Sequence, residues 1–405
     1  MTINLEIPKK LETLVSQANQ VATEVLRPIS RKYDRAEHTY PKELDMLAAL
    51  IDGMNEGGQH SGTGATGVRQ DRNGDAGEGN RNGTNLSTVL GLIEMAWGDV
   101  GLLLTMPRQG LGNSAIAAVA NEEQLERFAG KWAAMAITEP EAGSDSAAIR
   151  TTAVLDGDDY ILNGEKIFVT SGERAELVVV WATLDPKQGR PAIKSFVVER
   201  SNPGLKLDRL EHKLGIRASD TANFVLEDCR VPKQNLLGSP EIDTKKGFAG
   251  VMQTFDNTRP LVAGMGVGLA RACLEETEQR LAEAGVEIDY DHPPHVQSAA
   301  AAELLELQAE FEASWLLTLS AAWMADNSKP NSLQASMAKA KAGRSCVDIA
   351  LRCVALCGSA GYGEDGLLEK WARDAKILDL FEGTQQIQLL IVARQLLGKT
   401  SAELR

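Results

Sequence analysis

The 405-residue sequence is poor in aromatic residues, which make up 5%, and in cysteine, with five residues. It also lacks any run approaching the ~20 apolar residues of a membrane-spanning helix. Its first residues, Met1 to Glu6, do not have the pattern of a signal peptide. Positive charge is scarce, and the formal net charge of −14 argues against nucleic acids and anionic membranes as partners. These absences lead us to expect a cytoplasmic protein.

The five cysteines do not have the spacing of a zinc site. Cys346, Cys353 and Cys357 follow one another at i, i+7 and i+11, which is typical of residues packed in the core along one helix. We therefore expect five reduced thiols, as is usual in the cytoplasm, and no metal site.

The periodicity of apolar residues changes twice along the chain. Residues 8–50 have amphipathic helical patterning, residues 150–230 have the alternation and the Asp-Gly and Asn-Gly turns of strands, and the chain is helical again after Gly247. A chain of this length can bury two or three cores. We expect an α+β multidomain fold with an N-terminal helical domain over 1–134, a middle antiparallel β-domain over 135–245 and a C-terminal helical bundle over 246–405.

The stretch from Ile51 to Asn85 is rich in Gly, Asn, Asp and Arg and has few apolar residues. Such a composition buries too little apolar surface to offset the entropy lost on ordering. We expect an exposed loop over 51–85.

Glu382 lies at a corner between two expected helices. The pattern from Leu367 to Phe381 predicts a helix, Gly383 can take the left-handed conformation that ends it, and Thr384 is a good N-cap for the next helix. A glutamate beside a cap is most often simply solvated, and composition alone favours that interpretation.

The run Phe381-Glu-Gly-Thr-Gln-Gln-Ile-Gln-Leu-Leu-Ile-Val-Ala-Arg394 resembles the signature of the acyl-CoA dehydrogenase family, in which this Glu is the catalytic base. Other blocks of the family recur in the same order over most of residues 90–400. The resemblance implies the acyl-CoA dehydrogenase fold, FAD as cofactor, and α,β-dehydrogenation of an acyl-CoA in fatty-acid β-oxidation or related lipid metabolism. It also implies a tetramer that passes electrons to an electron-transfer flavoprotein. One subgroup places its base at the position of Thr258, which cannot serve, so Glu382 remains the only candidate.

Two further blocks resemble parts of the family's flavin site. The block Met135 to Asp145 resembles the loop that holds the flavin ring, and the block Lys166 to Gly172 resembles a strand whose aromatic residue stacks on the flavin. Without the resemblance, the first block would be an ordinary turn and Phe168 a core residue. The residues that the resemblance assigns to the cofactor are Thr138, Ser144, Phe168, Thr170, Thr384 and Gln386. Those assigned to the substrate are Ser144, Asp256 and Arg259, of which the last two also orient Glu382.

Other functions stay open at this point. An acyl-CoA oxidase shares these blocks but gives its electrons to oxygen, and a DNA-associated branch of the family is disfavoured by the acidic charge. A flavin-poor subunit that needs a homologous partner chain is the third alternative. In homotetrameric relatives the neighbouring subunit supplies an Arg and a Gln to the cofactor, and residues 286–290 and 355–361 lack them here. The sequence does not indicate the length or branching of the acyl group.

Overall fold

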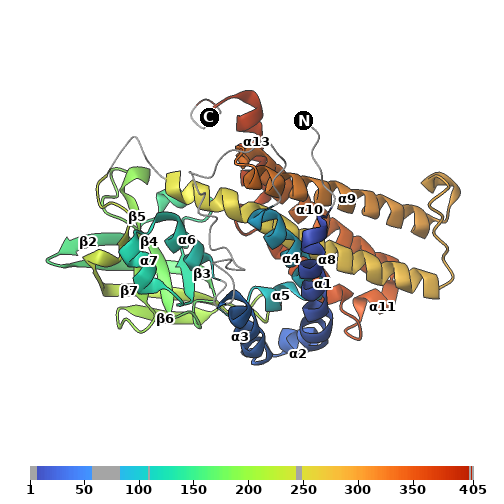
Figure 1. Cartoon of the computed structure of the whole chain (residues 1–405), viewed down its shortest axis with the longest axis horizontal. Helices are drawn as coiled ribbons and strands as arrows, with labels where there is room; N and C mark the ends of the chain where they lie inside the picture. The colour runs from blue at the N-terminus through green and yellow to red at the C-terminus, as the bar shows by residue number, and fades with distance from the viewer. Residues whose placement is uncertain (1–6, 57–82, 108–109, 243–248, 401–402, 404–405) are drawn as a thin grey trace.

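The computed structural model describes residues 7–56, 83–107, 110–242, 249–400 and 403; at 50–56 and 249–257 it describes the backbone only. Figure 1 shows the strands gathered at one end of the molecule and the long helices at the other, with most of the short N-terminal helices between them and two of these helices against the sheet. The predicted order of a helical, a β and a second helical part is confirmed. None of the described helices is long and apolar enough to cross a membrane.

The N-terminal part consists of short helices with buried apolar faces. They are α1 (Lys9–Val21), the π-helical turn Ala22–Leu26, α2 (Arg27–Arg35), α3 (Glu43–Glu56), α4 (Thr84–Gly98), α5 (Val100–Leu103), α6 (Leu111–Val119) and α7 (Glu122–Phe128). A capping box begins α7, because the side chains of Asn121 and Gln124 each accept the other residue's backbone N–H.

The loop predicted over 51–85 is wrong at both of its ends. Helix α3 continues to Glu56 and α4 begins at Thr84, while residues 57–82 lie outside the described residues. The start of α4 has a remote cause: the carboxylate of Asp326 accepts the backbone N–H groups of Gly83, Asn85 and Leu86 at 2.9–3.0 Å. These N–H groups have no acceptor within the helix. The carboxylate accepts their hydrogen bonds, and its negative charge interacts favourably with the positive end of the helix dipole.

The described residues of the middle part form an eight-stranded sheet. Its strands are β1 (Ala133–Ala136), β2 (Thr152–Asp156), β3 (Asp159–Thr170), β4 (Leu177–Thr183), β5 (Ile193–Glu199), β6 (Leu205–Leu210), β7 (Thr221–Pro232) and β8 (Leu236–Leu237). The order is β6-β7-β3-β2-β4-β5-β8, and most neighbours are antiparallel, although β1 and β2 each pair with β4 in parallel. Strand β4 is buried along its whole length, which explains its continuous apolar sequence.

The C-terminal part is a bundle of longer helices. They are α8 (Ala249–Glu283), α9 (Ala299–Asp326), α10 (Ser332–Leu356), α11 (Gly358–Tyr362), α12 (Leu368–Leu378) and α13 (Gln385–Leu397). Glycines let the helices approach closely, since a Cβ at Gly343 of α10 would lie 2.6 Å from the carbonyl oxygen of Leu378. All five cysteines are free thiols, and Cys346 and Cys353 are buried in the core as predicted.

A buried polar cluster joins the three parts. The ammonium of Lys370 on α12 binds the carboxylates of Asp99 at 2.7 Å and Asp374, and Asp374 accepts the backbone N–H of Ile216 from the loop between β6 and β7. Ser30 of α2 donates to Asp99. One buried cation therefore connects the N-terminal helices, the sheet and the bundle; we refer to these residues as the domain joint.

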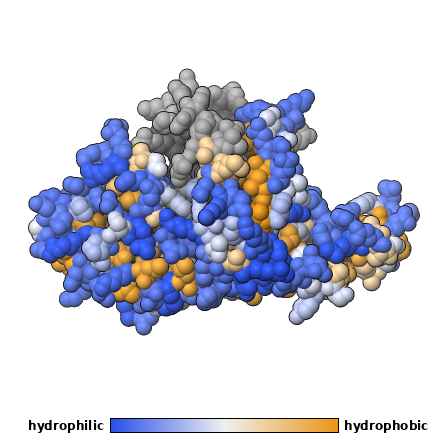
Figure 2. Space-filling model, turned by 90° about the horizontal axis from the view of Figure 1, so that it is seen from below, coloured by the Kyte–Doolittle hydropathy of each residue, from blue (hydrophilic) through white to orange (hydrophobic). Residues whose placement is uncertain are grey.

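Figure 2 shows one face on which blue residues dominate and hydrophobic residues form separate patches. Helix α13, by contrast, has four leucines that are exposed on the surface. They are Leu389, Leu390, Leu396 and Leu397.

Candidate active site

The corner between α12 and α13 has a left-handed backbone. Glu382 has φ = 55° and Gly383 has φ = 91°. The prediction that Gly383 takes this conformation is confirmed, and so is the N-cap, since Thr384 Oγ1 accepts the N–H of Ile387 at 3.4 Å. The left-handed conformation of Glu382 itself was not predicted, and for a residue with a Cβ it costs about 1–2 kcal/mol. Such strain persists only where neighbouring groups impose it.

Side chains from two helices hold this corner. Gln388 of α13 donates its amide to the carbonyls of Glu382 and Gly383 at 3.1 and 3.2 Å. The buried ammonium of Lys339 on α10 donates to the Gly383 carbonyl at 2.7 Å. The corner carbonyls, which no regular structure pairs, are therefore hydrogen-bonded. The sequence shows no local signal for the contact with Lys339, which is 44 residues from its partner.

Glu382 is half-buried, and the charges of two cations act on its carboxylate. Burial raises its pKa, while the hydrogen bond that Thr258 donates at 2.9 Å and the charges of Arg259 and Lys339 act to lower it. Arg259 is only 3% exposed and donates to Ser336 Oγ at 3.4 Å. By the family resemblance, Thr258 stands where one subgroup of acyl-CoA dehydrogenases has its base. Here Thr258 donates a hydrogen bond to the carboxylate of Glu382. A carboxylate with a raised pKa suits proton abstraction near neutral pH.

The two blocks assigned to the flavin lie side by side in the sheet region. The backbone N–H of Ile167 donates to the carbonyl of Thr138 at 2.9 Å. Phe168 has φ = 59° and lies at an irregularity in the pairing of β3 with β7, and the residue is 58% exposed. The alternative that Phe168 is a core residue is therefore wrong. A bulge turns a side chain out of the regular alternation, which here leaves a flat apolar ring uncovered.

A buried ion pair fixes the loop that carries Thr138. Lys166 binds the Glu139 carboxylate at 2.7 Å and the Ile137 carbonyl at 3.1 Å. The same carboxylate accepts the backbone N–H groups of Arg150 and Thr151. Sequence reasoning missed this pair, although both residues lie within the two blocks, because nothing in their spacing links them.

The other predicted site residues lie in the turn after Glu139, at the end of β3, at the start of α13 and in α8. Ser144 is exposed in the turn after Glu139, and Thr170 is half-buried at the end of β3. Thr384 and Gln386 lie at the start of α13, with Gln386 exposed. Asp256 lies in α8, where its side chain is outside the described residues.

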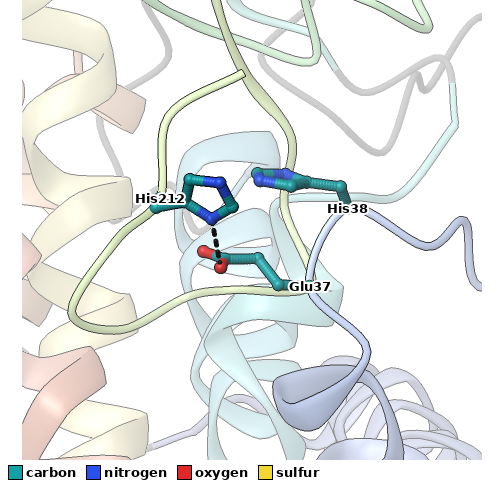
Figure 3. Close-up of side chains that lie close together, drawn as sticks. All are labelled: Glu37, His38 and His212. Atoms are coloured by element: carbon teal, nitrogen blue, oxygen red, sulfur yellow. Dashed lines mark hydrogen bonds and ion pairs between the residues drawn. The ribbon is translucent and has the colours of Figure 1, made fainter. Parts of the chain in front are cut away.

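Three further residues, which belong neither to the Glu382 corner nor to the flavin blocks, have the ligand types of a metal site. Oxygen and nitrogen atoms of Glu37, His38 and His212 lie within 4.8 Å of one another (Figure 3). The Glu37 carboxylate already accepts the backbone N–H of Lys213 and pairs with His212 Nδ1, each at 2.9 Å. The charge of Lys213 also acts on both Glu37 and His38, and would repel a cation. We interpret the three residues as a contact between the N-terminal helices and the β6–β7 loop.

The sheet region with Thr138 and Phe168 and the helical region with the Glu382 corner both match models of one protein family. The model of the acyl-CoA dehydrogenase middle domain matches residues 134–229, and that of the acyl-CoA dehydrogenase C-terminal domain matches residues 245–397. Acryloyl-CoA reductase (NADH) of Anaerotignum propionicum is 30% identical, over 98% of this chain and 97% of its own. The mitochondrial short-chain specific acyl-CoA dehydrogenase of Mus musculus is 31% identical, over 97% and 92%. A chain in the solved structure of the electron transferring flavoprotein of Acidaminococcus fermentans is 29% identical with a TM-score of 0.82, over 98% of this chain and 100% of that one.

The Thr138 loop and Phe168 lie within the middle-domain match, and the Glu382 corner lies within the C-terminal match. The similarity extends over nearly the whole length of the relatives, so it covers the helical parts as well as the sheet. The chain belongs to the acyl-CoA dehydrogenase family and is an FAD-dependent oxidoreductase.

Proposed function

We propose that this chain dehydrogenates an acyl-CoA thioester between its α and β carbons, with Glu382 as the base that removes the α-proton. The supporting observation is a carboxylate held at a rigid corner, where burial raises its pKa. The α-carbon of a saturated thioester is a weak acid, so the base works best when its pKa is close to the working pH. Thr258 orients the carboxylate through its hydrogen bond.

The residues around the corner fit this role. Arg259 is too deeply buried to reach far from the bundle, so we assign it to the orientation of Glu382 as much as to the substrate. Asp256 and Ser144 remain candidates for contacts with the acyl-CoA. We expect the backbone N–H of Glu382, by resemblance to the family, to donate to the thioester oxygen and stabilise the enolate-like charge.

The uncovered ring of Phe168 fits the flavin that the family uses. An exposed aromatic ring beside Thr138 offers a flat apolar surface on which an isoalloxazine can stack. We assign the cofactor to Thr138, Ser144, Phe168, Thr170, Thr384 and Gln386. Bound there, FAD supplies the acceptor for the β-hydride. The protein's own contribution is to orient the two partners and to take the proton.

The relatives favour a short acyl group and an electron-transfer flavoprotein as the partner that reoxidises the flavin. A second candidate is the reverse reaction, reduction of a short enoyl-CoA, because one relative is an acryloyl-CoA reductase (NADH). Assays with butyryl-CoA and an artificial acceptor, and with acryloyl-CoA and NADH, distinguish the two directions. Peroxide formed during turnover would instead indicate an acyl-CoA oxidase.

The decisive experiment on the base is Glu382→Gln. We expect turnover to fall about a hundredfold or more, the order of effect of losing a general base. Flavin content should stay close to wild type and the variant should remain folded, since Gln can keep the hydrogen bond with Thr258. Glu364→Gln, at an exposed surface pair with Arg35, is the matched control. If Glu382→Gln retains a tenth of the wild-type kcat, Glu382 is not the base.

The quaternary structure is a tetramer in this proposal, with a second, homologous chain supplying the Arg and Gln that residues 286–290 and 355–361 lack. The first of these segments contains Glu287 and Asp289, which would repel a diphosphate. Expressed alone, the chain should bind FAD weakly, and co-expression with the partner should restore yellow colour and activity. A fully flavinated, active homotetramer of this chain alone would contradict the hypothesis of two chains.

A further inference from the structure

Lys339 is a buried cation next to the corner that carries Glu382. It is 1% exposed, and the hydrogen bond of its ammonium goes to the neutral carbonyl of Gly383. A buried ammonium is costly unless charges of opposite sign compensate it. The carboxylates of Asp379 and Glu382 are the two that act on Lys339 favourably, whereas Arg259 acts against it. The position of Lys339 is thus stable only together with these acids.

The other charged groups leave Glu382 as the less compensated acid. Asp379, at the end of α12, binds Lys376 at 3.1 Å and Arg344 at 3.4 Å. Glu382 faces Thr258 and Arg259 from α8 and Lys339 from α10. Of these, Thr258 is neutral and Arg259 also donates to Ser336. Removal of the Lys339 charge would therefore leave Arg259 as the cation that acts on Glu382, whereas Asp379 would keep Lys376 and Arg344.

Resting on the proposed role of Glu382 as the base, we infer that Lys339 is its positioning residue: it holds the left-handed corner through the Gly383 carbonyl, and its charge keeps the Glu382 carboxylate ionised and able to accept a proton. Neither function requires contact with the substrate. A buried carboxylate without nearby cations would be protonated at neutral pH and could not act as a base.

Three substitutions separate the charge of Lys339 from its hydrogen bond. Lys339→Met removes both, Lys339→Gln removes the charge but retains a donor for the Gly383 carbonyl, and Lys339→Arg retains the charge. The matched control is Lys341→Met, two residues along the same helix, where the lysine pairs with Glu310 at the surface.

We expect the acid limb of the pH profile of kcat to move upwards by about one unit in the Met and Gln variants, the lower end of the effect of one nearby charge. On that limb, kcat should fall about tenfold at fixed pH while KM stays nearly constant. The Arg variant and Lys341→Met should keep the wild-type profile. If the Met variant does not fold, Lys339→Gln still tests the inference, because it preserves the hydrogen bond to the Gly383 carbonyl.

A second measurement needs no turnover. The difference in Tm between wild type and Glu382→Gln, followed over pH, reports the protonation of the Glu382 carboxyl. In the background of Lys339→Gln the change in this difference should occur at higher pH. An unchanged acid limb in both neutral variants would overturn the inference, even if they lose activity. An active Glu382→Gln would instead refute the proposed function, so the two failures are distinguishable.

Discussion

Glu139 is buried and has a lowered pKa, so its contribution to the stability of the Thr138 loop depends on pH under acid conditions. Burial raises its pKa, but the charge of Lys166 and hydrogen bonds from Arg150, Lys166 and Thr151 together lower it below the ordinary value. A carboxyl whose pKa is lower in the folded than in the unfolded state stabilises the fold above its unfolded pKa. That stabilisation is lost as the pH falls through the folded pKa.

We predict that Lys166→Met lowers the free energy of unfolding at pH 7 by about 3–5 kcal/mol, because it leaves the Glu139 carboxylate buried without its cation. The difference from wild type should narrow as the pH falls through the pKa of Glu139. Denaturant unfolding followed by tryptophan fluorescence measures both effects. Lys206→Met, at an exposed pair with Glu227, should cost about 0–1 kcal/mol and serves as the control. Equal losses in both variants would refute the importance of the buried pair.

At the scale of elements, the close approach of α10 to α12 sets where the Glu382 corner begins. A Cβ at Gly343 would lie 2.6 Å from the carbonyl oxygen of Leu378, the last residue of α12. Because this contact is with the backbone of α12, rotation of a side chain cannot relieve it. Gly343 and Lys339 lie one turn apart on α10, so one face of this helix contacts both the end of α12 and the Glu382 corner.

We predict that Gly343→Ala destabilises the protein by about 1–3 kcal/mol, the usual cost of overpacking, although alanine favours a helix over glycine. It should also lower kcat, since displacement of Leu378 shifts the corner that follows. Thermal unfolding and turnover are the two measurements. Gly143→Ala, with open space around its Cβ position, is the control and should leave the Tm within error. A Gly343→Ala variant as stable as wild type would show that α12 shifts freely.

Features at this scale differ in how well the sequence predicted them. The N-cap at Thr384, the left-handed Gly383 and the buried Cys346 depend on residues within a few positions, and the structure confirms them. The start of α4 depends on Asp326, and the fixed corner depends on Lys339. These partners are distant in the chain, so no local pattern could indicate them.

At the scale of the whole molecule, the domain joint makes the three parts depend on one lysine. Burial lowers the pKa of Lys370, but the charges of Asp374 and Asp99 outweigh this effect and raise it above the ordinary value. Lys370 is therefore charged at neutral pH. The contacts of the joint reach α2, α12 and the β6–β7 loop.

We predict that Lys370→Met lowers the free energy of unfolding by about 3–5 kcal/mol, since two buried carboxylates then face each other without a cation. We also expect the parts to unfold in separate steps, visible in calorimetry as two transitions in place of one. Lys32→Met, at an exposed pair with Glu43, is the control. A single, only slightly shifted transition in Lys370→Met would show that the joint does not couple the parts.

The burial of Lys339 has a chemical consequence for an enzyme of thioesters. Burial lowers the pKa of this lysine to about 8, so part of it is an unprotonated amine at neutral pH. Such an amine is a nucleophile that could attack an acyl thioester and form an amide irreversibly. Enclosure between α10 and the Gly383 carbonyl denies it access. The packing that holds the Glu382 corner thus also keeps this amine away from acyl thioesters.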